Sequence, residues 1–318
     1  MSFFPQLVAG PIERAKDLVP QFLKVNKVNY ELLRSGLLLM LWGFFKKIVI
    51  ADRLAIFVDG SYGDVAGIDG VTSFYAVVFF AFQLYIDFSA YSDIAIGSSK
   101  LLGFNLSTNF KRPYLASSFS NFWKRWHISL SSWFKDYVYI PLGGSRTSKI
   151  KFIRNILVVF MLSGLWHGAS WNFVLWGLIN GVFILIFDRF LVKKNANLFR
   201  RVISSFFIST LWALSLVLFR AETLTDAISI YGNLFNESKD VLFNYGLNQK
   251  EFYFTLKLLV CYMVFELILE KYTNCYTWFT NRNFILRWAL YISALLFIIF
   301  YGSYGVGLND NNFIYFQF

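Results

Sequence analysis

The two histidines of this chain are its side chains best suited to acid–base chemistry near neutral pH. The 318 residues contain only His127 and His167, and each directly follows a tryptophan. His167 lies within a long apolar stretch, residues 152–191. Because an ionisable group is costly at membrane depth, its position favours a functional role over that of a core histidine bonded to the backbone. We therefore expect His167 to lie in a reaction site.

The residues around His167 are small or aromatic, as in the segment 166–177, WHGASWNFVLWG. Gly164, Gly168 and Ala169 remove bulk on both sides of the histidine. Small residues allow either close helix packing or close approach of a substrate, and the sequence leaves both alternatives open. Three tryptophans are expected to line a chamber that excludes water: Trp126, Trp166 and Trp171.

His127 lies in a second segment rich in polar and aromatic residues, 122–144, FWKRWHISLSSWFKDYVYIPLGG. A serine–histidine nucleophilic pair is conceivable, since His127 and Ser131 are four residues apart and would share one face of a helix. No acidic residue has the spacing to orient His127, so this pair is disfavoured. Three basic residues are candidates for binding a phosphate-bearing donor, although the charge bias of cytoplasmic loops explains them as well: Lys124, Arg125 and Arg146.

Two acidic residues, Asp87 and Asp93, interrupt another apolar segment at residues 82–97. Asp93 is four residues from Ser89, which places both on one polar stripe of a helix. These carboxylates either line an aqueous chamber or pair with lysine or arginine on a neighbouring helix. A proton relay would need further acids in other spans, and only Glu266 is a candidate.

The composition is that of a polytopic membrane protein. Hydrophobic residues make up 57% of the chain, charged residues 15%, and the mean hydropathy is +0.50, whereas a soluble domain carries about 25% charged residues. We expect an all-α fold in a single membrane-embedded domain over residues 1–318. Seven transmembrane helices are predicted: residues 33–58, 71–97, 152–167, 171–191, 202–220, 253–270 and 286–306.

Basic and acidic loops alternate along the chain. Segment 100–154 holds ten basic residues against one acid, Asp136. Its aromatic residues recur at helical spacing, which predicts an interfacial or re-entrant helix near 100–150. The positive-inside rule places residues 1–32 and 100–151 inside and the tail 307–318 outside. The net charge of +11 is thus attributed to cytoplasmic loops facing anionic lipid and not to nucleic acid.

Other classes of site are not indicated by the sequence. Two histidines and the distant Cys261 and Cys275 do not predict a metal site. No Walker A sequence and no Gly-rich dinucleotide motif opens a helix, which argues against nucleotide hydrolysis.

Several long motifs, taken in order, carry a family resemblance. They are FFPQLVAGPI at residues 3–12, GFFKKIVIADRLA at 43–55, QLYIDFSAYSDIAIGSSKLLGF at 83–104, the His127 segment, and LSGLWHGASWNFVLWGLINGVF at 162–183. The chain resembles the membrane-bound O-acyltransferase family, and within it the alginate O-acetyltransferase-like bacterial branch. The resemblance implies that His167 is the catalytic histidine and that His127 is a second functional histidine.

The resemblance also implies the reaction. An acetyl group would pass from a cytoplasmic thioester, expected to be acetyl-CoA and not a permanently bound cofactor, toward a hydroxyl group. The acceptor would be a polysaccharide or peptidoglycan, served by a periplasmic or extracellular SGNH-type acetyltransferase partner. His167 would be the general base for the acceptor hydroxyl or the group that orients the acyl ester, and His127 would assist at the donor.

The family resemblance further implies location and completeness. Membership of this branch predicts a multi-pass protein of the bacterial inner (cytoplasmic) membrane. Members usually carry several more helices before the FFPQLVAGPI motif. We therefore expect residues 1–318 alone to insert into the membrane and to show weak or no O-acetylation.

Two other functional classes remain open. A transporter or flippase would use Asp87, Asp93 and the histidines as a relay and would move its substrate without covalent chemistry. An inactive scaffold of an envelope acylation complex is the third class. A neighbouring gene for a secreted SGNH-type esterase-like protein would favour acylation.

Overall fold

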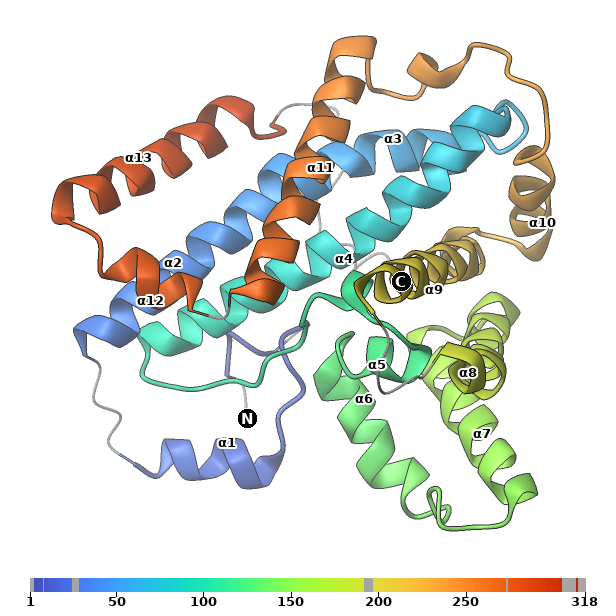
Figure 1. Ribbon diagram of the computed structural model, residues 1–318, viewed down its shortest axis with the longest axis horizontal. Coiled ribbons are helices and arrows are strands. Elements are labelled where there is room, and N and C mark those ends of the chain that lie inside the picture. The colour runs from blue at the N-terminus through green and yellow to red at the C-terminus, as the bar shows by residue number, and fades with distance from the viewer. Residues whose placement is uncertain are drawn as a thin grey trace. The chain divides into compact units, whose positions relative to one another are not determined.

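The computed structural model describes residues 3–7, 9–24, 29–191, 197–272, 274–304 and 313. The regular elements among these residues are all helices (Figure 1). Within this described part of the chain, six helices are long and apolar enough to cross a membrane: α4 (Gly70–Leu101), α7 (Lys149–His167), α8 (Trp171–Leu191), α9 (Leu198–Arg220), α11 (Gln249–Lys271) and α13 (Phe284–Tyr301). The predicted all-α polytopic fold is confirmed, and six of the seven predicted spans coincide with these helices.

The remaining predicted span, residues 33–58, has a different character. It falls on a continuous helical stretch made of α2 (Tyr30–Phe44), the π-helical η1 (Phe45–Ala51) and α3 (Asp52–Gly63). Four consecutive or near-consecutive charged residues lie in its middle: Lys46, Lys47, Asp52 and Arg53. The stretch is not among the six candidate spans because α2, with 15 residues, and α3, with 12, are each short for a span. The span at residues 33–58 stays a prediction.

The chain forms two compact units. The first comprises Met1–Phe57, Phe82–Leu106 and Phe243–Gln317, and the second comprises Val58–Ala81 and Ser107–Leu242. The long helix α4 contributes residues to both. The single-domain expectation for residues 1–318 stays a prediction.

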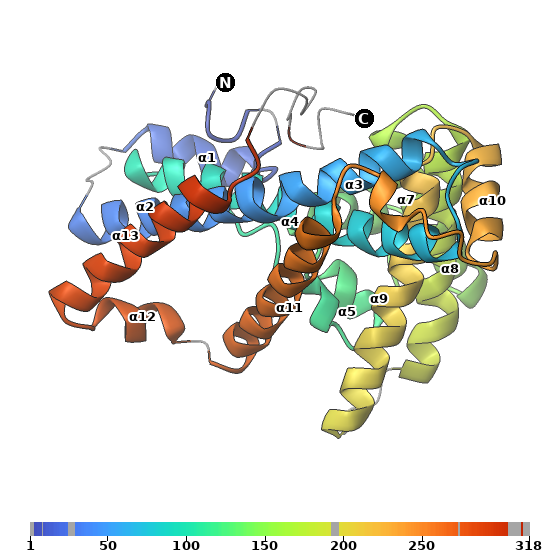
Figure 2. The same ribbon diagram turned by 90° about the horizontal axis from the view of Figure 1, so that it is seen from above.

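In the second unit, α7 and α8 form a tightly packed helical hairpin (Figure 1). A Cβ atom on Gly164 would lie 2.2 Å from the carbonyl oxygen of Phe173, and one on Gly177 would lie 2.2 Å from that of Phe160. These glycines therefore allow two helix backbones to meet. Of the two alternatives for Gly164, the structure shows helix packing. Figure 2 shows α9 lying alongside α8, which extends the bundle to three helices.

The basic segment after α4 folds into short helices in place of one interfacial helix. They are η2 (Pro113–Leu115), α5 (Phe119–Trp123), α6 (Ile128–Phe134) and the π-helical η3 (Lys135–Tyr139). The carboxylate of Asp188 in α8 accepts hydrogen bonds from the backbone N–H groups of Phe119, at 2.8 Å, and Ser120, at 3.1 Å. An acidic side chain at this position compensates the free N–H groups of the first turn of α5. None of these helices is a candidate span, in keeping with the predicted non-spanning segment.

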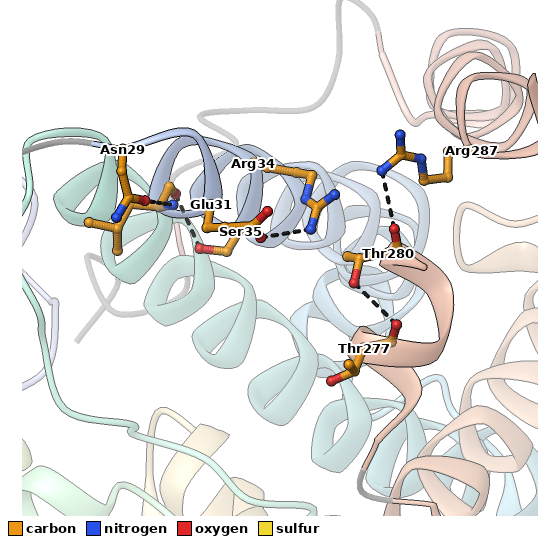
Figure 3. A network of polar contacts seen from close by, with 8 residues as sticks. Asn29, Glu31, Arg34, Ser35, Thr277, Thr280 and Arg287 are labelled. Carbon is orange, nitrogen blue, oxygen red and sulfur yellow. Dashed lines mark hydrogen bonds and ion pairs between the residues drawn. The ribbon is translucent and has the colours of Figure 1, made fainter. Parts of the chain in front are cut away.

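The first unit holds α1 (Ala15–Phe22), α2, η1, α11, α12 (Cys275–Thr280) and α13. The element η1 packs against both α11 and α13. A side-chain cap links α12 to α13, since Arg287 Nη1 donates to the Thr280 carbonyl oxygen at 3.1 Å (Figure 3). The same view shows the start of α2, where Glu31 and Arg34 form an ion pair of 2.7 Å.

Two acid-rich loops of the second unit meet around Asp69. The fully buried carboxylate of Asp69 accepts from the backbone N–H of Lys239 at 2.6 Å, from Ser238 Oγ at 3.1 Å and from the N–H of Thr72 at 2.8 Å. Burial opposes ionisation of this carboxyl, but the hydrogen bonds to its charged form together have the larger effect and lower the pKa of Asp69. The loops before α4 and after α10 (Leu224–Asn233) therefore lie on one side of the unit, as their shared predicted location requires.

This arrangement makes the membrane topology testable. Single cysteines at the exposed positions Asp64 and Asn236 are expected to react with a membrane-impermeant thiol reagent in intact spheroplasts, and one at exposed Lys149 is not. The free residues Cys261 and Cys275 are first replaced to give a silent background. Labelling of position 149 with protection of the other two would invert the predicted orientation. The predicted inner position of Lys193 and the outer position of the tail lie outside the described residues.

Candidate active site

The backbone around His127 joins α5 to α6 in a left-handed conformation. His127 has φ 41° and ψ 54°, values that cost a non-glycine residue energy and that cluster at functional sites. Neighbouring hydrogen bonds hold this geometry. The N–H of Ile128 donates to the Asn109 carbonyl oxygen at 2.9 Å, and the N–H of Lys111 donates to that of Arg125 at 2.8 Å. The loop of residues 109–111 thus braces the histidine from outside its own helices.

The imidazole of His127 is buried against that loop. Its Nδ1 lies 3.1 Å from Asn109 Oδ1, and both side chains are almost wholly inaccessible. The ring of Phe110 stacks near it, with 6.4 Å between the ring centroids. Burial, and in second place the electrostatic influence of His167, lowers the pKa of His127 well below its ordinary value. His127 is therefore a neutral imidazole at physiological pH.

His167 lies at the opposite end of the same site, as the last residue of α7. Helix α7 continues unbroken through Gly164 and ends at the cap residue Gly168, so the backbone turns directly after the histidine. The ring meets the edges of Trp176, with centroids 5.3 Å apart, and Phe219, at 5.2 Å. Three helices, α7, α8 and α9, thereby fix the ring.

Trp166 connects the two histidines. Its ring centroid lies 6.2 Å from that of His127 and 5.0 Å from that of His167. Both contacts are edge-on, and Trp166 itself is 47% exposed. The structure therefore brings together the two ionisable rings that the sequence singled out, although 40 positions separate them in the chain.

An aromatic cluster backs this site. Trp126 packs on Trp212 of α9 at 4.8 Å between centroids, and Trp212 packs on Trp123 at 5.5 Å and on Trp176 at 5.9 Å. Trp126 is buried, and its role as a chamber wall stays a prediction. Neither Trp123 nor Trp212 was singled out from the sequence. No local pattern distinguishes these two tryptophans from the other aromatic residues of the chain, because their contacts join α5 to α9 across about 90 positions.

Other predicted site residues take different positions. Trp171, at the start of α8, is 73% exposed, and Lys124 and Arg146 are exposed. Arg125 donates from Nε to Asn121 Oδ1 at 3.1 Å and from Nη1 to the carbonyl oxygens of Lys111 and Arg112. Arg125 thus braces the loop that holds His127, and its predicted contact with a donor phosphate stays a prediction.

His127 and Ser131 do not share the helix face that their spacing predicted. His127 precedes α6 as its cap, so it does not share a helix face with Ser131. The hydroxyl of Ser131 donates instead to the carbonyl oxygen of Trp126 at 3.2 Å. The expected shared helix face is wrong because the backbone leaves helical geometry at His127, and the pair itself was already disfavoured from the sequence.

The acids Asp87 and Asp93 belong to a buried charge network in the first unit. Lys47 Nζ lies 2.9 Å from Asp87 and 2.9 Å from Asp52. Lys46 Nζ lies 2.8 Å from Asp93 and 2.8 Å from Ser89 Oγ, which joins the two members of the predicted polar stripe. Of the two alternatives, the structure shows pairing with lysines.

The sequence did not indicate that Lys46 and Lys47 are the partners of these acids, nor that both lysines lie in a π-helix. Lys46 and Lys47 are adjacent, yet each reaches a carboxylate of α4, from the π-helical η1. Glu266, the other acid considered for a relay, accepts a hydrogen bond from Tyr85 at 2.8 Å. π-Helical turns are rare and are often found at functional sites, and here one presents both lysines to the carboxylates of α4.

Comparisons with known proteins agree with the motifs. The family model described as "MBOAT, membrane-bound O-acyltransferase family" matches residues 1–219. The chain is 37% identical over 234 residues to the peptidoglycan O-acetyltransferase of Helicobacter pylori. The aligned residues make up 72% of this chain and 44% of that protein. It is 40% identical over 238 residues to a probable alginate O-acetylase of Pseudomonas putida, and this alignment covers 74% of this chain and 48% of that protein.

The similarity to a teichoic acid D-alanyltransferase is lower. The Bacillus subtilis protein of that name is 30% identical over 198 residues, covering 59% of this chain and 50% of that protein. The chain spans about half the length of the curated relatives it matches. Because the family model matches residues 1–219, more than half of the chain and including both histidines, the chain belongs to the membrane-bound O-acyltransferase family.

Proposed function

We propose that this protein transfers an acetyl group from a cytoplasmic thioester, acetyl-CoA, toward a hydroxyl group of a cell-envelope polysaccharide or peptidoglycan. The observation that carries the proposal is the meeting of His127 and His167 at Trp166 in a membrane-embedded helical unit. The names of relatives that modify alginate and peptidoglycan support the acceptor class. A secreted SGNH-type partner and an inner-membrane location are part of the same proposal.

The chemistry needs one proton acceptor and a site that excludes water. As the acceptor oxygen attacks the thioester carbonyl, a histidine takes up the hydroxyl proton, the C–O bond forms and the C–S bond breaks. The departing thiolate then receives that proton. The second histidine orients the acyl group, and the cluster of Trp123, Trp126, Trp176 and Trp212 shields the thioester from hydrolysis.

Membrane vesicles of opposite sidedness test the direction of transfer. Inside-out vesicles that contain the product of the complete gene, given acetyl-CoA labelled in the acetyl group, are expected to form alkali-labile acetyl ester. Sealed right-side-out vesicles given the same donor are expected to remain at background until they are permeabilised. Equal labelling of sealed right-side-out vesicles would contradict a cytoplasmic donor. Absence of ester in both preparations would contradict acetyl-CoA as the donor.

A further inference from the structure

The buried side chain of Asn109 makes the contact that decides the chemistry of His127. Its Oδ1 atom lies 3.1 Å from His127 Nδ1, 2.9 Å from Ser129 Oγ and 3.3 Å from the backbone nitrogen of Ser129. Asn109 is fully buried, and His127 and Ser129 are each 4% exposed. Three groups from the start of α6 thus converge on one oxygen that comes from the loop after α4.

The orientation of the Asn109 amide follows from the backbone. A backbone N–H can only donate, so the atom of Asn109 that faces the nitrogen of Ser129 must be the amide oxygen and not the NH₂ group. The same oxygen carries no hydrogen. In its hydrogen bond with His127, the proton must therefore reside on Nδ1.

The position of that proton fixes the other nitrogen. A neutral imidazole carries one ring proton, so protonation at Nδ1 leaves the lone pair at Nε2. His127 is neutral because burial disfavours its charged form. Its Nε2 can then accept a proton or a hydrogen bond but cannot donate one to the thioester carbonyl.

We propose that Asn109 is a positioning residue that holds His127 as the Nδ1–H tautomer, which makes His127 Nε2 the proton acceptor of the reaction. This inference rests on the proposed acyl transfer, and it assigns the two histidine roles left open there. His127 takes the hydroxyl proton as the C–O bond forms and returns it to the departing thiolate, and His167 orients the acyl group. Asn109 plays the part that a buried carboxylate plays beside other catalytic histidines, without adding a charge.

The left-handed backbone at His127 serves the same end. His127 is the cap residue directly before α6, in the turn that follows α5. In this conformation the ring lies against the Asn109 side chain, and the N–H of Ile128 donates to the Asn109 carbonyl oxygen. Asn109 consequently holds the histidine ring through its side chain and the next residue, Ile128, through its main chain. Such double anchoring keeps a ring in one orientation through the catalytic cycle.

The tautomer can be read directly by nitrogen NMR. With ¹⁵N-histidine labelling, residues 1–318 give two imidazole spectra, because the chain has two histidines, and the His167→Gln variant assigns them. His127 is expected to show a protonated Nδ1 and an unprotonated Nε2, unchanged between pH 6 and 8. An Nε2–H tautomer, or titration within that range, would overturn the proposal irrespective of activity.

Substitutions of Asn109 connect the tautomer to the rate. In the complete gene product, Asn109→Ala is expected to lower the acetyl-transfer rate by about 10²-fold and to allow the Nε2–H tautomer to form. Asn109→Asp retains an oxygen acceptor, so it should keep the Nδ1–H tautomer and restore most of the rate. Its negative charge should also raise the pKa of His127 and move the pH–rate profile upward. Asn121→Ala, which removes an amide that contacts Arg125 and not His127, is the control and should leave the tautomer unchanged.

A double-variant comparison separates positioning from general structural support. Asn109→Ala placed in a His127→Ala background should cause no further loss of rate, because Asn109 acts through His127. A further loss equal to that of the single variant would overturn the positioning role. If His127→Ala alone retained the wild-type rate, the catalytic assignment of His127 under the proposed function would fail, whatever tautomer the NMR spectra show.

Discussion

Replacing His167 with alanine is expected to reduce acetyl transfer in inside-out vesicles by about 10²- to 10⁴-fold, the range typical of a lost acid–base or orienting group. The ring is held by Trp166, Trp176 and Phe219 at the end of α7. No other histidine except His127 is present in the chain to replace it. The rate of alkali-labile ester formation, normalised to the amount of protein in the vesicles, measures the effect.

Two controls show whether that loss is chemical. Membrane abundance of His167→Ala should stay near that of the wild type, because His167 is only partly buried and ends its helix. Trp171→Phe, at an exposed position four residues further along, should transfer acetyl groups at nearly the wild-type rate. Wild-type transfer by His167→Ala at equal abundance would remove His167 from the mechanism.

Removing the charge of Lys47 is expected to have the largest effect on stability. Lys47→Met keeps most of the aliphatic stem but leaves the carboxylates of Asp52 and Asp87, both buried, without their shared cation. Breaking a buried ion pair by removing one partner costs about 3–5 kcal/mol. Denaturant unfolding of the detergent-solubilised protein, followed by tryptophan fluorescence, measures the loss.

An exposed ion pair of the same unit provides the matched control. Glu31 is 63% exposed and pairs with Arg34 at 2.7 Å (Figure 3). Glu31→Ala should cost no more than about 1 kcal/mol, as exposed pairs usually do. Should Lys47→Met and Glu31→Ala prove equally mild, the buried network would not be what stabilises the first unit.

The long apolar helices were predictable from the sequence because their signal is a local run of hydrophobic residues. Residues 171–191 coincide with α8, and the ends of the other five helices differ by a few residues. For the stretch at residues 33–58 the sequence did not show how Lys46 and Lys47 are accommodated, because the carboxylates that compensate them lie about 40 positions away. Hydropathy along the chain does not contain that information.

The site was predictable in its ionisable groups but not in its supports. His127 and His167 were recognisable because a histidine beside tryptophan in an apolar segment is unusual. Asn109 was not, because an asparagine in a polar loop has many ordinary roles. The spacing argument for Ser131 also failed, because it assumes an unbroken helix and the backbone is left-handed at His127. Long-range contacts decide both features.

Acyl transfer by His127 and His167 is tested most directly by the ester content of the cell envelope in a strain lacking the gene. The strain is complemented either with the complete wild-type gene or with the same gene carrying His127→Ala and His167→Ala, at matched membrane levels. Acetate released from envelope polymer by mild alkali is then measured. We predict that the wild-type gene restores ester-bound acetate and that the double variant leaves it at the level of the deletion strain. Restoration of ester-bound acetate by the double variant would show that these two histidines do not carry acyl transfer.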